Sequence, residues 1–181
     1  MERQIFTVKI TPSDPAAPIV FVEVAEFIRQ VSPCDVHVEH VGSTSIPNVA
    51  GKGIIDCMVT GPHDRMDEIQ RAISEAGMDH NSSSHPDPDR WYASGSFTQA
   101  CGARMHVHIH ITYPGSACEI DHLRFRDYLR ANRREAVRYV RMKHEWRARV
   151  GDDRVVFTDA KTPYIQSVLA KAKAGIEGTE A

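Results

Sequence analysis

The sequence lacks the features that define several large classes of protein. No apolar stretch approaches the roughly 20 residues that a membrane-spanning helix needs. The four cysteines form no Cys-x-x-Cys pair, which argues against a structural zinc ribbon. There are no internal repeats and no low-complexity tracts. Residues 1–10 carry no signal-peptide pattern, so we expect a cytoplasmic protein with reduced thiols and no membrane partner.

The composition that is present is that of a folded domain with an uneven charge. Of 181 residues, 41% are hydrophobic and 25% are charged, which is enough to bury a core. Between residues 124 and 149, ten Lys and Arg side chains oppose three Asp and Glu, a local charge of +7. The rest of the chain carries −9, from 12 basic and 21 acidic residues. This asymmetry indicates either an anionic partner or two helices whose basic faces are solvated.

Hydrophobic periodicity predicts an α/β (α+β) fold, in which a mixed β-sheet core is followed by a helical C-terminal tail. We expect the core to span residues 1–115, the tail to span 116–176, and residues 177–181 to fray, all within one structural domain. The predicted strands are 4–10, 35–41, 53–59, 90–97 and 105–113, and the predicted helices are 16–31, 64–76, 119–131, 133–149 and 159–174.

The first candidate site is the loop after the second predicted strand, Gly42-Ser43-Thr44-Ser45. Glycine lets the backbone approach a ligand closely, and successive N–H groups together with three hydroxyls are able to hold phosphate oxygens. The Gly-x-x-x-x-Gly-Lys-Ser/Thr spacing of a P-loop is absent. An ordinary surface turn has the same composition, so the loop alone does not decide the function.

The second candidate is Asp56, a carboxylate within the apolar strand Ile54–Val59. A strand with apolar residues on both faces is buried, and an unpaired charge there costs several kcal/mol. Asp56 therefore needs a metal, a cationic partner or an exposed strand end. Lys52, four residues earlier, is either that partner or a ligand to phosphate. A structural arginine paired with Asp56 is the alternative.

The third candidate is a strand in which histidine alternates with apolar residues: His106, His108 and His110. Because alternate residues of a strand share a face, the three imidazoles point the same way. Such a row suits a divalent metal or a phosphate. A solvated polar face produces the same pattern.

These motifs, in this order, resemble the GrpB family of nucleotidyltransferase-like proteins. The matching segments are Glu39-His40-Val41-Gly42-Ser43-Thr44-Ser45-Ile46-Pro47, Lys52-Gly53-Ile54-Ile55-Asp56, His108-Ile109-His110, Phe125-Arg126-Asp127-Tyr128-Leu129-Arg130, and the positions Ala136, Tyr139, Lys143, Lys161 and Tyr164-Ile165. The resemblance runs through residues 20–172. It implies a nucleotidyltransferase-like sheet with a helical tail.

The resemblance also implies a chemistry, from which the chain departs. Active members of the superfamily hold a triphosphate on the Gly-Ser turn and two magnesium ions on an Asp-x-Asp or Asp-x-Glu pair, with a third carboxylate on a neighbouring strand. Here Asp56 stands alone, between Ile54 and Met58. The two-metal site is therefore incomplete, and the family name supplies no reaction.

Three functions follow from these residues. In the first, Gly42, Ser43, Thr44, Ser45 and Lys52 bind a nucleotide or another phosphorylated ligand, Arg126 and Arg130 close over it, and Asp56, His108 and His110 are catalytic or hold Mg²⁺, Mn²⁺ or Zn²⁺. In the second, the chain is a non-catalytic binding or adaptor domain, with RNA as a further partner of the basic tail. In the third, His108 is the nucleophile of a histidine-triad hydrolase or transferase.

Overall fold

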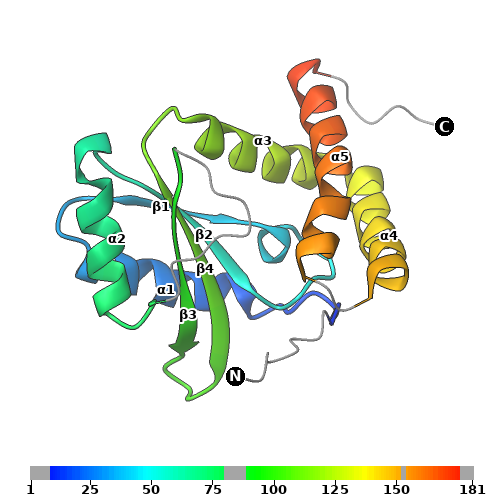
Figure 1. Cartoon of the computed structure of the whole chain (residues 1–181). Helices are drawn as coiled ribbons and strands as arrows, with labels where there is room; N and C mark the ends of the chain where they lie inside the picture. The colour runs from blue at the N-terminus through cyan, green and yellow to red at the C-terminus, as the bar shows by residue number, and fades with distance from the viewer. Residues whose placement is uncertain (1–8, 80–88, 152–153, 176–181) are drawn as a thin grey trace.

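The computed structural model describes residues 9–79, 89–151 and 154–175 (Figure 1). Most of the strand predicted at 4–10, and the end of the chain predicted to fray at 177–181, therefore lie outside the described residues. The remaining predicted elements are present. Among the described residues, no helix has the length and apolar character needed to cross a membrane.

A mixed four-stranded sheet forms the centre of the molecule, in the order β1-β2-β4-β3. The strands are β1 (His37–Val41), β2 (Ile55–Thr60), β3 (Trp91–Thr98) and β4 (Arg104–Thr112). β2 runs parallel to β4, while β1 and β3 pair antiparallel at the two edges. In the β2–β4 register Asp56 is opposite His108, and Met58 is opposite His110. This register brings two of the predicted sites together.

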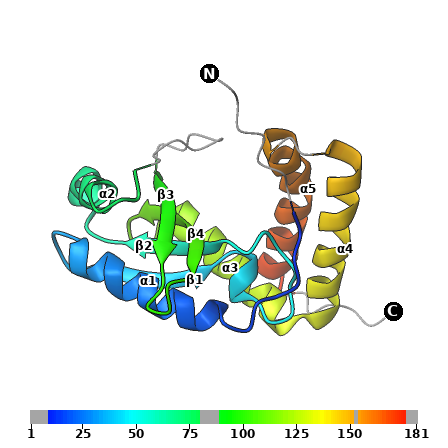
Figure 2. The same cartoon turned by 90° about the horizontal axis from the view of Figure 1, so that it is seen from below.

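One face of the sheet is covered by α1 (Ala17–Val31) and α2 (Met66–Glu75), as Figure 2 shows from below. Both helices are amphipathic, and each buries its apolar stripe on the sheet. The stripe of α1 includes Val20, Val24 and Ile28, all almost fully buried. Their partners are the inward residues of β2 and β4: Ile55, Cys57, Val59, Val107, Ile109 and Ile111. Because side chains alternate along a strand, Asp56 and the histidines of β4 face the other way.

Three helices form the tail, which packs beside the sheet: α3 (Ala117–Ala131), α4 (Arg133–Val150) and α5 (Arg154–Lys173) (Figure 1). Ser116 caps α3 by accepting a hydrogen bond from the N–H of Glu119 at 3.0 Å. The tail has its own core, in which Ala136, Tyr139 and Trp146 of α4 are buried, as the spacing of these residues predicts. This second core holds α4 and α5 next to the loop that follows β1.

The second face of the sheet is covered only in part. α3 packs on it through Cys118 and Leu123, which meet Val41 of β1 and Met58 of β2. The polar residues of β2 and β4 lie on the same face. The N-terminal segment joins the molecule at the loop before β2, where Thr11 and Gly51 form an isolated antiparallel β-bridge.

Candidate functional site

The loop predicted to hold phosphate is a 3-10 turn, Ser43–Ser45, which follows directly from β1. The Ser45 hydroxyl donates to the Gly42 carbonyl at 2.7 Å, and the Thr44 hydroxyl donates to the Ile54 carbonyl at 2.9 Å. Each hydroxyl has a single O–H to give, so neither donates to a phosphate in this arrangement. The donors that fit the prediction are then the Ser43 hydroxyl and the backbone N–H groups at the start of the turn.

Gly42 is required both by the shape of the turn and by its neighbour. Its backbone has φ +68° and ψ −170°, a region that is populated almost only by glycine. A Cβ at this position would collide with the carboxylate of Asp56, and would lie 2.7 Å from its Cγ and 2.8 Å from its Cβ. The carboxylate of β2 is therefore packed directly beneath the turn.

Asp56 also faces the histidines of β4. Its Oδ1 is 3.2 Å from Nδ1 of His108 and 3.9 Å from Nε2 of His110. The first distance is within hydrogen-bonding range, whereas the second is a longer electrostatic contact. The three side chains are largely buried, with exposed fractions of 21%, 16% and 14%. The structure thus brings the three predicted catalytic residues together, while their catalytic role stays a prediction.

The electrostatics of this group favour an ionised carboxylate beside a neutral imidazole. Burial alone raises the pKa of Asp56, but the imidazoles of His108 and His110 outweigh burial and hold that pKa well below its usual range. Burial lowers the pKa of His110, and Asp56 offsets this only in part. A neutral imidazole still donates one N–H to the carboxylate, so a lowered pKa of Asp56 is compatible with a lowered pKa of His110.

Two further residues border the group, Tyr92 and His122, and no sequence pattern singled out His122 as a site residue. Tyr92 of β3 packs its ring against His108 and His110, with ring centres 5.7 and 5.6 Å away. His122 of α3 lies 4.9 Å from the ring of His110, and burial lowers its pKa to about 4. Only the neighbour relationship between α3 and β4, which is a property of the fold, identifies His122. His106 is exposed and contacts the edge of the His108 ring.

The position of a second carboxylate on β2 is filled by an apolar side chain. Met58 is almost fully buried against Val41 and Cys118, so no ligand reaches it in this arrangement. Across the described residues, no group of three or more His, Cys, Asp or Glu side chains is arranged to hold a metal ion. The metal ligands predicted at Asp56, His108 and His110 make contacts with one another instead.

The two arginines predicted to close over a substrate make contacts within the protein. Arg126 donates to Glu39 at 2.6 Å and to the His40 carbonyl at 3.0 Å. Arg130 donates through Nε and Nη2 to the Ser45 carbonyl, at 3.0 and 2.8 Å. In this arrangement both arginines tie α3 to β1 and its loop. Their predicted contact with an anionic ligand stays a prediction.

Replacing Arg126 with Met is expected to lower the free energy of unfolding by about 2 to 3 kcal/mol, because a buried carbonyl and Glu39 lose a charged donor. Urea denaturation measures this difference. Arg124→Met is the matched control, since Arg124 lies on the same helix, is more exposed and makes only a 3.7 Å contact with Asp121. Equal losses in the two variants would contradict a structural role for Arg126.

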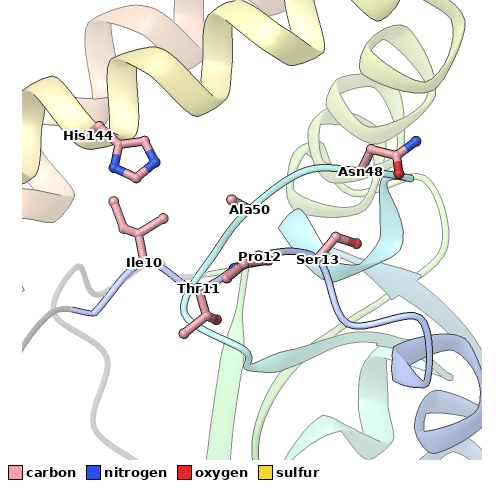
Figure 3. A pocket seen from close by; sticks show the side chains of 7 residues that line it. All are labelled: Ile10, Thr11, Pro12, Ser13, Asn48, Ala50 and His144. Carbon is pink, nitrogen blue, oxygen red and sulfur yellow. The ribbon is translucent and has the colours of Figure 1, made fainter.

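A hollow of about 460 Å³ lies apart from these residues, between the N-terminal segment and α4. Its lining is Ile10, Thr11, Pro12, Ser13, Asn48, Ala50 and His144. Figure 3 shows His144 pointing from α4 toward Ile10, with Ala50 between them and Asn48. None of the predicted site residues lines the hollow. A charged ligand finds only one titratable side chain here, so we place the candidate site at Asp56 instead.

The sheet topology and the tail place the chain in the class of nucleotidyltransferase-like folds. Over 77% of this chain, the structure is similar to the Cid1 poly(U) polymerase bound to MgGTP, with a TM-score of 0.55 and 17% identity. It is also similar to a cytoplasmic RNA terminal U-transferase, with a TM-score of 0.52 and 15% identity. The matches cover 45% and 43% of those chains, so this chain spans less than half of either enzyme.

Within that class the chain belongs to the GrpB family, since the family described as "GrpB protein" matches residues 7–171. The crystal structure of GrpB from Enterococcus faecalis is similar over 92% of this chain and 98% of that one, with 28% identity and a TM-score of 0.76. A UPF0157 protein of Halalkalibacterium halodurans is 33% identical over 89% of this chain and 80% of its own. A UPF0157 protein of Pseudomonas aeruginosa is 30% identical over 92% of this chain and 68% of its own.

Proposed function

We propose that this protein binds a nucleotide or another phosphorylated ligand at the Gly42–Ser45 turn, and that Asp56, His108 and His110 act on that ligand. The observation that carries the proposal is the buried carboxylate of Asp56, held between the turn and the imidazole of His108. The likeness of the fold to a polymerase bound to MgGTP supports a nucleotide as the ligand.

In this proposal His108 acts as the general base. With Asp56 facing Nδ1 at 3.2 Å, that nitrogen would donate to the carboxylate, which leaves Nε2 as the atom that takes up a proton. Nε2 is buried and has no hydrogen-bond partner among the described residues. A carboxylate that fixes the tautomer and orientation of an imidazole in this way is a recurring device for proton transfer. The proton of an attacking hydroxyl or water would then go to Nε2.

A divalent metal is a second way for these residues to act. A donor set of one carboxylate and two imidazoles suits Zn²⁺ or Mn²⁺ better than Mg²⁺, which prefers oxygen ligands. Such an ion would neutralise phosphate charge. It would have to replace the proton between Asp56 and His108.

A thermal-shift screen tests the proposal with AMP, ADP, ATP and their uridine counterparts, each in EDTA and with Mg²⁺, Mn²⁺ or Zn²⁺. A ligand present at about 100 times its dissociation constant adds about 2.7 kcal/mol of stability, or a rise of roughly 5 to 10 °C in the midpoint. No shift with any nucleotide in a well-folded sample would overturn the proposal.

Asp56→Asn separates catalysis from binding. We expect the variant to lose phosphate-releasing activity at least 100-fold, because the amide holds His108 less well and carries no charge. Metal-free nucleotide affinity should stay within a few-fold, since the site loses a negative charge and no phosphate donor. Asp121→Asn is the control, as Asp121 is a surface residue on α3. Full activity in Asp56→Asn would refute the assigned role.

The second candidate function is a binding or adaptor domain without catalysis. The buried Met58, which occupies the place of a second carboxylate, is the observation that favours it. In that case wild-type protein binds nucleotide, releases no phosphate, and Asp56→Asn behaves like wild type. RNA is a further ligand to include in the screen because of the basic tail.

A further inference from the structure

Three lysines from distant parts of the chain lie near the segment that joins the Gly42–Ser45 turn to β2. Lys52 precedes β2, Lys143 lies on α4 and Lys161 lies on α5. The ammonium groups of Lys52 and Lys161 lie 5.0 and 5.3 Å from the centre of the same ring, that of Phe157. The two are therefore within about 10 Å of each other. Both contacts are cation–π contacts with a buried ring.

Lys143 connects this pair to the turn. Its ammonium donates to the Ala50 carbonyl and lies 4.2 Å from the centre of the Tyr139 ring. A Cβ on Gly51 would be 3.8 Å from that ammonium and 3.1 Å from Cβ of Ser43. Lys143 and Ser43 therefore border the same point, which glycine leaves open. The ammonium of Lys143 is consequently next to Ser43, whose hydroxyl is a predicted phosphate donor.

Gathering three cations here is costly for the fold. Lys143 is only 4% exposed, and burial, followed by the charge of Lys161, lowers its pKa to about 7. Lys52 adds to the decrease, while Asp56 opposes it. Cation–π contacts offset only part of the cost of burying an ammonium group. Packing alone thus gives no reason for lysine at position 143.

We propose that Lys52, Lys143 and Lys161 form one anion subsite, which binds the terminal phosphates of a nucleoside di- or triphosphate. The first phosphate of that ligand would lie on the Gly42–Ser45 turn, so the inference rests on the proposed function and narrows it to polyphosphorylated ligands. Ammonium groups act on phosphate as point charges, and three of them spread over this distance match an extended polyanion better than a single phosphate.

Isothermal titration calorimetry in EDTA and low salt tests this with AMP, ADP, ATP and inorganic tripolyphosphate. We expect wild-type protein to bind ATP at least tenfold more tightly than AMP. Lys52→Met and Lys161→Met should each lose about five- to tenfold in ATP and tripolyphosphate affinity, with AMP affinity unchanged within twofold. Lys173→Met on α5 is the control, because Lys173 is exposed and faces Asp121.

The outcomes separate this inference from the proposal on which it rests. If AMP and ATP bind equally well, the lysine subsite is wrong and the phosphate-binding turn stands. If tripolyphosphate binds through the lysines but no nucleotide binds, the subsite stands and the nucleotide is wrong. If no phosphorylated compound binds at all, both fall. Lys143→Met, checked for folding by circular dichroism, should lose the preference for ATP more completely than either other variant.

Discussion

Gly42→Ala is expected to destabilise the protein by about 3 to 4 kcal/mol and to abolish ligand binding at the turn. The backbone region of Gly42 costs a residue with a side chain about 1 to 3 kcal/mol. The added methyl also collides with Asp56, including its Cβ at 2.8 Å, so rotation of the side chain alone does not relieve the clash. Urea denaturation and the nucleotide thermal-shift screen measure the two effects.

Gly102→Ala provides the matched control for that experiment. Gly102 also has a positive φ, +87°, and nothing lies within 4 Å of where its Cβ would be. The Gly102→Ala variant should therefore lose only about 1 kcal/mol of stability, from the backbone conformation alone, and keep its ligand affinity. If Gly42→Ala were no more harmful than Gly102→Ala, the carboxylate of Asp56 would not be packed beneath the turn in solution.

The elements of this fold were predictable because their signals are local. The stripe Val20, Val24 and Ile28 marks the buried face of α1, and the alternation along residues 105–111 marks the two faces of β4. Each pattern spans only a few turns or residues, and burial follows it directly. The resemblance to the GrpB family supplied the arrangement of these elements, which periodicity alone does not determine.

The sequence predicted that Asp56 acts together with His108 and His110, but local patterns do not give the contacts that bring these side chains together. Asp56 and His108 belong to separate strands, and their contact depends on the β2–β4 register, a pairing between segments about 50 residues apart in the chain. The partners of Arg126 and Arg130 were not predicted either. The sequence shows basic residues on the tail, but the packing of α3 decides that they reach Glu39 and the Ser45 carbonyl.

Lys143 shows the same limit most clearly. Its segment reads as a basic, solvated helix face, yet the second core places the ammonium under the Ala50 carbonyl. A lysine at this position is therefore expected to lower the stability of the folded protein. A residue that weakens the fold at the edge of a candidate site is a stronger functional signal than its presence in a basic segment.

Lys143→Met is accordingly expected to stabilise the protein at pH 7 while it removes the preference for ATP over AMP. A pKa lowered from 10.5 to about 7 corresponds to a cost on the order of 4 kcal/mol near neutral pH. Methionine avoids this cost. It also leaves the Ala50 carbonyl without its donor, which destabilises the variant by about 1 to 3 kcal/mol. We expect a net gain of about 1 to 3 kcal/mol in urea denaturation.

The pH dependence of that gain identifies its cause. Between about pH 7 and 10.5 the folded wild type binds fewer protons at Lys143 than the unfolded chain does, so its stability rises with pH in this window. The advantage of Lys143→Met should therefore shrink as the pH increases toward 10. Arg141→Met, at an exposed position on the same helix, should show neither the gain nor the pH trend. If Lys143→Met were less stable than wild type at pH 7, Lys143 would be a structural anchor of the loop, and its charge would need no ligand to explain it.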